Sequence, residues 1–319
     1  MRQSIIIKPK TSKIVDKDMP DFGDNEVLVR VRACGVCASE LHGGWLNGTN
    51  YPLEAGHEAA GEVVAVGSAV KNIYPGMRVT GLFSSGFAEY AVARADRVAP
   101  IPDGISYDIA AALSEPLSCV VSSTRRTPVE IGDTAAIVGL GFMGLLKLQT
   151  LLLKGVTKAI AIDVREEALD TARKFGAEES YLPSNVPEEY KLNSWDRLNG
   201  DWGVNLAVEA SGSQPALSLA VQLPKAHGYL NILGYHQGGK REVDVELLNW
   251  KAVTVINGHE RRDDYKMDCL RRGLNLLIKD KINYKPLVTH RYSLEEVDRA
   301  FEALLNKPDG FIKAVIVID

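Results

Sequence analysis

Sulfur, imidazole and carboxylate groups gather in two short segments of this chain. Residues 34–42 read Cys-Gly-Val-Cys-Ala-Ser-Glu-Leu-His, and residues 56–61 read Gly-His-Glu-Ala-Ala-Gly. One cysteine, one histidine and several carboxylates close together form the mixed donor set of a catalytic zinc, which keeps one coordination position open. The two segments therefore predict a metal centre.

The spacing of Cys34 and Cys37 also fits a redox pair. Such a pair normally sits at a helix N-terminus in a thioredoxin-like unit, whereas this one leaves an alternating strand. We therefore interpret Cys34 as a small side chain that fills space in the core.

A glycine-rich turn predicts a dinucleotide site. Gly139-Leu-Gly-Phe-Met-Gly144 follows the apolar run 135–138 and precedes the helical run 145–153. The first glycine makes the tight turn, the second lets the backbone approach a pyrophosphate, and the third lets helix pack on strand. The alternative is a glycine-rich turn in a doubly wound sheet that binds no nucleotide.

Asp163 ends the next apolar strand, nineteen residues after Gly144. A carboxylate there accepts hydrogen bonds from the adenosine ribose and repels a 2′-phosphate, so it favours NAD over NADP. Arg165 lies two residues further and could serve a phosphate instead.

The hydrophobic pattern of the sequence changes once along the chain. Between Glu26 and Pro100 the apolar residues mostly alternate in short runs, which predicts a largely antiparallel β region. From Asp133 onward the apolar runs are continuous and separated by helical stretches, as in a parallel α/β sheet; these runs are 135–138, 159–162, 206–208, 229–233 and 253–256. We expect helices over 166–175 and from the capping box at 293–296 to Leu305, and a strand over 314–318. The stretch 184–203 is the most loop-like insertion.

Composition narrows the class of protein. The 319 residues are 45% hydrophobic and 24% charged, which suits two ordinary domains. The net charge of −4 is spread without a basic block, so nucleic acid is not an expected partner. No apolar run is long enough for a signal peptide or a membrane span, and four unevenly spaced cysteines do not make a disulfide framework. A cytoplasmic location is expected.

The two metal-type segments resemble the motifs G-x-C-x-S/T-D-x-x-H and G-H-E-x-x-G of the zinc-dependent medium-chain dehydrogenases, apart from Glu40 in place of Asp. The resemblance extends over nearly the whole chain. It implies an α/β protein in which residues 1–121 and 260–319 form a GroES-like β-rich catalytic domain. Residues 122–259 would form a doubly wound Rossmann domain that binds NAD.

The same resemblance implies roles for single residues. The zinc ligands would be Cys37 and His57, with Glu58 as a ligand or an adjacent carboxylate, Ser39 as the relay hydroxyl and His42 as the proton shuttle. The cofactor would contact Gly139, Gly141, Phe142, Met143, Gly144, Asp163 and Arg165, and its nicotinamide would lie near Ser211, Gly212, Leu233 and Gly234. His236 and His259 each follow an expected strand end of this domain and are either pocket-lining residues or exposed loop histidines.

Residues 113–118, Leu-Ser-Glu-Pro-Leu-Ser, resemble the corresponding segment of sorbitol-type polyol dehydrogenases. There Glu115 replaces the cysteine of simple-alcohol enzymes and would bind zinc directly or through water. Glu115 has a second interpretation, as a first-turn acid favoured by a helix dipole. Residues 79–87 contain none of the four cysteines that bind a structural zinc in relatives, so one zinc per chain is expected.

These features predict an NAD- and zinc-dependent enzyme that reversibly oxidises a secondary hydroxyl of a polyol, cyclitol or sugar alcohol to a ketone. One alternative is a zinc-free, NADPH-dependent quinone or enone reductase on the same architecture, although it would have no reason to keep the metal-type residues. The other alternative is a non-catalytic nucleotide-binding protein, because fold does not fix function.

The last apolar run of the cofactor domain, residues 253–257, is expected at the edge of its sheet. It contains no proline, and no charge lies between Lys251 and His259, so it lacks the features that normally prevent an edge strand from pairing with a strand of another chain. In the resembling family two cofactor domains join their sheets at this strand. We therefore expect a homodimer, or a homotetramer built on it.

Overall fold

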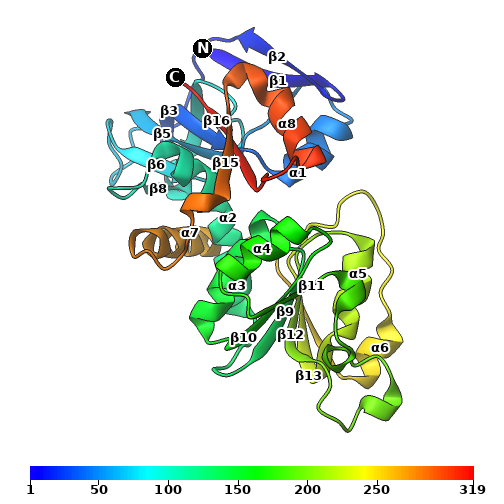
Figure 1. The fold of residues 1–319 in the computed structure, drawn as a ribbon. Coiled ribbons are helices and arrows are strands. Elements are labelled where there is room, and N and C mark those ends of the chain that lie inside the picture. Colours follow the sequence, from blue (N-terminus) through cyan, green and yellow to red (C-terminus); the bar gives the residue numbers. More distant parts are fainter. The chain divides into compact units, whose positions relative to one another are not determined.

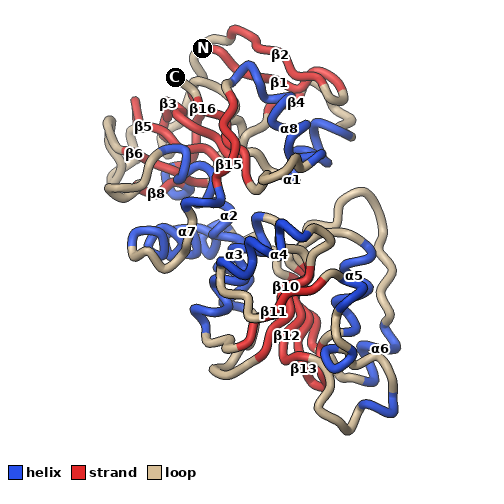
Figure 2. The backbone as a smooth tube through the Cα atoms, viewed as in Figure 1, coloured by secondary structure: helices blue, strands red, loops and turns tan.

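Two stretches far apart in the sequence, Met1–Ser118 and Arg261–Asp319, build one β-rich unit, and the residues between them, Cys119–Glu260, build an α/β unit. The computed structural model describes all 319 residues. Figure 1 traces the chain through both units, and Figure 2 marks its helices and strands. None of the helices combines the length and the apolar character needed to cross a bilayer.

The β-rich unit is organised around a seven-stranded sheet in the order β15-β16-β3-β5-β6-β8, with β7 also paired to β3. Its strands are β3 (Glu26–Gly35), β5 (Glu58–Val66), β6 (Arg78–Gly81), β7 (Tyr90–Arg94), β8 (Val98–Pro100), β15 (Val288–Tyr292) and β16 (Lys313–Val317). Every neighbouring pair except β15–β16 is antiparallel, which confirms the prediction made from the alternating pattern. A smaller sheet joins β1 (Arg2–Lys8), β2 (Thr11–Asp16) and β4 (Leu53–Glu54).

The helical elements that lie in this unit, or begin in it as α2 does, are short apart from three. They are α1 (Ala38–Glu40), a π-helical turn η1 (Leu41–Leu46), the 3₁₀ turns η2 (Ala95–Arg97), η6 (Lys285–Leu287) and η7 (Leu294–Glu296), α2 (Tyr107–Arg126), α7 (Asp263–Ile278) and α8 (Val297–Asn306). The predicted capping box of Ser293 and Glu296 is formed, and its first turn is 3₁₀ rather than α. Trp45 stacks on Phe301 with ring centroids 5.6 Å apart, which packs α8 against η1.

Helix α2 corrects one interpretation of Glu115. The helix begins at Tyr107, so Glu115 lies in its middle and not in its first turn. The α-helix includes Pro116, which has no N–H to donate to the preceding turn. Proline is common in the first turn of a helix, so Pro116 suggested that the helix began there and not at Tyr107.

The α/β unit contains six parallel strands in the order β11-β10-β9-β12-β13-β14. They are β9 (Thr134–Val138), β10 (Lys158–Ile162), β11 (Glu179–Tyr181), β12 (Val204–Glu209), β13 (Pro224–Ile232) and β14 (Thr254–Asn257). The helices between them are α3 (Phe142–Lys154), α4 (Glu166–Lys174), α5 (Gln214–Gln222) and α6 (Val245–Trp250), and Figure 1 shows α3 and α5 on opposite faces of the sheet. The predicted parallel sheet is confirmed, with β14 at its edge.

Helix α3 buries a lysine in the middle of its apolar face. Lys147 is fully buried, and its amine donates to Ser123 Oγ at 3.1 Å and to Thr124 Oγ1 at 3.2 Å, both on α2. Burial lowers the pKa of Lys147 well below its usual value, and the positive charges of Lys154 and Arg126 lower it further. This amine is therefore held among hydroxyl groups instead of carboxylates.

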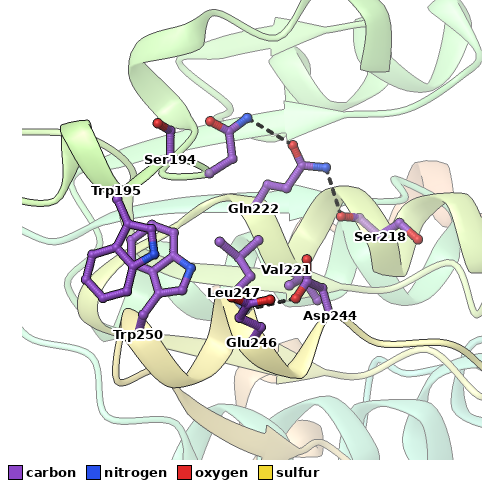
Figure 3. A pocket seen from close by; sticks show the side chains of 10 residues that line it. Ser194, Trp195, Ser218, Val221, Gln222, Asp244, Glu246, Leu247 and Trp250 are labelled. Atoms are coloured by element: carbon purple, nitrogen blue, oxygen red, sulfur yellow. Dashed lines mark hydrogen bonds between the residues drawn. The ribbon is translucent and has the colours of Figure 1, made fainter.

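The insertion at 184–203 folds into three 3₁₀ turns, η3 (Pro183–Asn185), η4 (Glu188–Tyr190) and η5 (Trp195–Arg197). Figure 3 shows how it docks on α5 and α6, with Trp195 stacked on Trp250 at a centroid distance of 5.0 Å. Asn193 donates to Gln222 Oε1 at 3.3 Å, and Gln222 in turn donates to the Ser218 carbonyl at 3.1 Å. A hollow of about 380 Å³ remains between these elements. The amide side chains that line this hollow, Asn193 and Gln222, already bond to each other. We therefore interpret the hollow as part of the packing between the insertion and the two helices.

Candidate active site

Strands β3 and β5 bring the two metal-type segments together. Gly35 at the end of β3 is the register partner of Glu58 at the start of β5. Cys37 follows the first strand and His57 precedes the second, so antiparallel pairing places their side chains at the same end of the sheet. One potential ligand atom from each of Cys37, His57 and Glu58 lies within 4.8 Å of the others.

A carboxylate outside this cluster orients the imidazole. Glu40 Oε1 lies 3.0 Å from His57 Nδ1 and accepts hydrogen bonds from the backbone N–H groups of Gly56 at 2.5 Å and His57 at 3.1 Å. A carboxylate that accepts from Nδ1–H leaves Nε2 as the ligand nitrogen, the arrangement found around metal-bound histidines. Sequence reasoning noted Glu40 only as a departure from the family motif and assigned it no role.

Glu58 is the buried member of the cluster. Its Oε2 lies 2.5 Å from Lys313 Nζ, which also donates to the Val36 carbonyl at 3.0 Å. The Glu58 and Lys313 side chains are only 1% and 5% exposed. A Cβ at Gly35 would lie 2.0 Å from Glu58 Oε2, so only glycine leaves room for this carboxylate.

The second carboxylate oxygen of Glu58 indicates whether the cluster suits a zinc ion. Glu58 Oε1 is buried and has no hydrogen-bond partner. A buried acceptor without a partner is costly, and here it stands beside a thiol and an imidazole that are themselves zinc ligands. The three donors therefore suit a zinc ion.

Opposing effects set the protonation of the cluster. Burial by itself lowers the pKa of His57, but the adjacent Glu40 carboxylate and Cys37 raise it well above the usual value. Burial raises the pKa of the Glu58 carboxyl, in spite of the opposing charge of Lys313. Burial also raises the pKa of Cys34 well above its usual value, which makes this thiol unreactive at neutral pH.

The other expected catalytic residues lie around the cluster in different ways. Ser39 Oγ donates to Cys37 Sγ at 3.3 Å, and His42 is exposed on η1. Glu115 is buried on α2 outside the three-residue cluster, with Oε1 3.4 Å from Lys266 Nζ of α7. Direct or water-bridged ligation by Glu115 remains a prediction.

The glycine-rich turn of the α/β unit has the geometry that a pyrophosphate requires. Gly139 has a φ of +98°, which favours glycine. A Cβ at Gly144 would lie 1.9 Å from the Gly139 carbonyl oxygen, so the third glycine permits close packing of helix on strand. Gly141 is the N-cap of α3 and has open space where a Cβ would stand. A phosphate could approach the helix N-terminus through that space.

Asp163 and Arg165 lie beside this turn. Asp163 accepts hydrogen bonds from the backbone N–H groups of Leu140 at 2.7 Å and Arg165 at 3.0 Å. The Arg165 guanidinium lies 3.5 Å from Asp163 and 3.3 Å from Glu167, so two carboxylates already balance its charge.

On the other side of the turn, a buried carboxylate organises the loop after β12. Glu209 Oε1 accepts from Ser211 N, Ser211 Oγ and Gly212 N, each at 2.8 Å. Its Oε2 lies 2.8 Å from His236 Nε2. Sequence reasoning missed Glu209, although an acid directly after the apolar run 206–208 was a visible signal.

Two family models match this chain. Residues 23–103 match the family model of the alcohol dehydrogenase GroES-like domain, and residues 143–269 match that of the zinc-binding dehydrogenases. Sorbitol dehydrogenase of Bacillus subtilis strain 168 is 29% identical over 351 aligned positions, covering 99% of this chain and 97% of that protein. The expected combination of a GroES-like domain and a Rossmann sheet is confirmed.

Two solved structures show the same fold. The 2R,3R-butanediol dehydrogenase of Bacillus subtilis is 25% identical, with a TM-score of 0.83 over 100% of this chain and 99% of that one. A protein of Sinorhizobium meliloti 1021, provisionally assigned as a zinc-binding dehydrogenase and bound to NADP, is 25% identical, with a TM-score of 0.84 over 99% of this chain and 98% of that one.

Proposed function

We propose that this chain reversibly oxidises a secondary hydroxyl of a polyol, cyclitol or sugar alcohol to a ketone, with NAD as the hydride acceptor. The chain belongs to the zinc-binding medium-chain dehydrogenases and is an alcohol oxidoreductase. The observation that carries the proposal is the cluster of Cys37, His57 and Glu58, with its spare carboxylate oxygen. The similarity to a sorbitol dehydrogenase supports a polyhydroxylated substrate.

Cys37, His57 and Glu58 would hold the zinc, with Glu115 as a further oxygen ligand, directly or through water. A bound zinc lowers the pKa of a hydroxyl group in contact with it, which makes the alcohol a better hydride donor. Glu40 keeps His57 in the tautomer that presents Nε2. The buried ammonium group of Lys313 balances the negative charge of Glu58, which keeps this buried carboxylate available as an oxygen ligand.

The proton of the alcohol needs a path to water. Ser39, whose hydroxyl contacts Cys37 Sγ, is positioned to accept it first, and His42 on the exposed side of η1 would release it to solvent. NAD, when bound, accepts the hydride on its nicotinamide ring.

The preference for NAD rests on Asp163. Its carboxylate stands beside the glycine-rich turn, where it would repel a 2′-phosphate. Arg165 offsets only part of this charge, because the two carboxylates of Asp163 and Glu167 share its guanidinium and a net negative charge remains.

Metal analysis combined with a substrate panel tests the proposal. Purified protein should contain one zinc per chain and should reduce NAD with one or more polyols or cyclitols, as measured by cofactor absorbance. Cys37→Ala should abolish turnover and leave NAD binding unchanged, whereas Cys34→Ala is the matched control and should remain active. A zinc-free protein that reduces enones with NADPH would contradict the proposal, and so would a zinc-loaded protein without turnover on any alcohol.

A further inference from the structure

A buried imidazole nitrogen in a loop of the α/β unit has no hydrogen-bond partner. It is Nδ1 of His236, in the loop that follows β13. The other nitrogen of the ring, Nε2, lies 2.8 Å from Glu209 Oε2, and the His236 side chain is 14% exposed. Buried polar atoms are normally satisfied, so an unpaired one needs an explanation.

The contacts of Glu209 determine which nitrogen of His236 carries the proton. Glu209 is completely buried, and every group that meets its Oε1 is a donor: Ser211 N, Ser211 Oγ and Gly212 N. With these donors around it, the Glu209 carboxylate acts as a hydrogen-bond acceptor. Nε2 of His236 faces this acceptor, which favours the tautomer with the proton on Nε2 and leaves Nδ1 as an acceptor that lacks a donor.

The sheet order locates the two halves of a bound dinucleotide. β9 and β12 are neighbours in the sheet, while β10 lies beyond β9 and β13 beyond β12, so the strand order reverses between β9 and β12. A dinucleotide lies across the carboxyl ends of the strands at such a point. Asp163 occupies the β10 side, which takes the adenosine ribose, so the nicotinamide half belongs on the β12 and β13 side.

Close contacts connect His236 to that half of the site. A Cβ at Gly139 would lie 2.9 Å from Ser211 N, so the loop after β12 abuts the pyrophosphate turn. A Cβ at Gly234 would lie 2.3 Å from Glu209 Oε2, so the loop after β13 closes on the same carboxylate. His236, two residues beyond Gly234, stands where the nicotinamide end of a dinucleotide would arrive.

We propose that His236 Nδ1 accepts a hydrogen bond from the carboxamide N–H₂ of the nicotinamide, and that Glu209 is a positioning residue that fixes the required tautomer. The inference rests on the dinucleotide site of the proposed function. The carboxamide nitrogen can only donate, so it needs an acceptor in a dry site, whereas the ribose hydroxyls can also accept and can turn toward other partners. His236 thereby selects a cofactor with a primary amide at this position.

Binding measurements on the holoenzyme test this without relying on turnover. The probes are NAD, its thionicotinamide analogue, which keeps the N–H₂ group, its 3-acetylpyridine analogue, which has a methyl group instead, and ADP-ribose, which lacks the ring. The wild type should bind NAD and the thionicotinamide analogue about tenfold more tightly than the acetylpyridine analogue. In His236→Leu this ratio should fall to about one, with ADP-ribose affinity unchanged.

A second variant tests the tautomer. In Glu209→Gln the new amide can accept from the loop N–H groups and donate to His236 Nε2, which moves the ring proton to Nδ1. The preference for a carboxamide should disappear although the imidazole remains. His236→Gln, which retains an acceptor oxygen, should recover part of the preference.

Several results would overturn the inference. If His236→Leu keeps the tenfold ratio, the carboxamide finds its acceptor elsewhere. If all three dinucleotides weaken equally and ADP-ribose does not, the contact is to the pyridinium ring and not to its amide. If ADP-ribose, which keeps the ribose, weakens as well, His236 contacts the ribose or has a structural role. A wild type that binds no dinucleotide would refute the proposed function itself, which is distinct from loss of the carboxamide preference alone.

Discussion

Removal of the buried cation beside the metal cluster gives a quantitative test of the site. In Lys313→Met the chain loses the amine that lies 2.5 Å from Glu58 Oε2 and 3.0 Å from the Val36 carbonyl. Both charged side chains are almost fully buried, so water cannot replace the lost partner. Breaking a buried pair by removing one member costs about 3–5 kcal/mol of the free energy of unfolding. For a domain of this size that is a fall in Tm of roughly 6–20 °C.

The pH dependence of this loss follows from the Glu58 carboxyl. Its pKa is raised by burial already in the wild type, and loss of Lys313 removes the main charge that opposes the rise. A group with a raised folded pKa takes up a proton in the folded state more readily than in the unfolded chain, so the variant gains stability as pH falls. The deficit of Lys313→Met should therefore be smaller at pH 5 than at pH 8.

Urea unfolding of the metal-free protein, followed by circular dichroism at both pH values, measures these differences. The matched control is the double variant Glu58→Met with Lys313→Met, which removes both charges and should be close to the wild type in stability. A single variant within 1 kcal/mol of the wild type at pH 8, or a double variant as unstable as the single one, would refute the reasoning. Zinc added to Lys313→Met should restore part of the stability, because it supplies a positive charge to Glu58.

Four further changes test other parts of the molecule. Glu40→Gln should weaken zinc affinity about 10- to 100-fold in a chelator competition, because the carboxylate that orients His57 is lost; unchanged affinity would contradict the assignment. Asp163→Ser should narrow the gap between NAD and NADP in kcat/KM, and a wild type that prefers NADP would refute the premise. Because burial lowers the pKa of Lys147, its protonation favours the unfolded chain at every pH below the usual lysine value of about 10.4. Lys147→Met should thus raise the urea midpoint more at pH 7 than at pH 9.5, and an equal gain at both would argue against it. Val255→Pro should lower the assembly state measured by light scattering, since it removes a donor from the exposed edge strand β14, and a monomeric wild type at micromolar concentration would overturn the dimer.

The parts of the fold that sequence reasoning predicted are those encoded locally. The strands of the α/β unit are continuous apolar runs, because a parallel sheet covered on both faces has no polar side. Helix α4 ends at Lys174, and Gly176 follows two residues later at a φ of +100°, in agreement with the stop that its sequence indicated. The two metal-type segments were also visible, since their reactive residues lie close together along the chain.

What was missed depends on contacts between distant residues. Glu58 and Lys313 are 255 positions apart, and no local pattern connects them. Glu209 and His236 meet only because β12 and β13 are neighbours in the sheet. The first turns of helix α2 escaped prediction because Pro116 was taken as the start of a helix, and helix α7 was not predicted either. For the ion pair of Glu58 and Lys313, the only local signal was a lysine amid the apolar residues around position 313.

The pairing of β16 with β3 has a consequence for how the protein is made. A ribosome that has reached Glu260 has already supplied Cys37, His57 and Glu58, together with the whole α/β unit. It has not yet supplied β16, whose Val315 pairs with Gly35 and whose Lys313 neutralises Glu58. Until that strand emerges, residues 33–35 of β3 lack their partner on one side and the Glu58 carboxylate lacks the Lys313 counterion. The metal cluster is therefore completed by the last part of the chain to be translated, and a polypeptide released too early would contain all three clustered ligands without the charge that supports them.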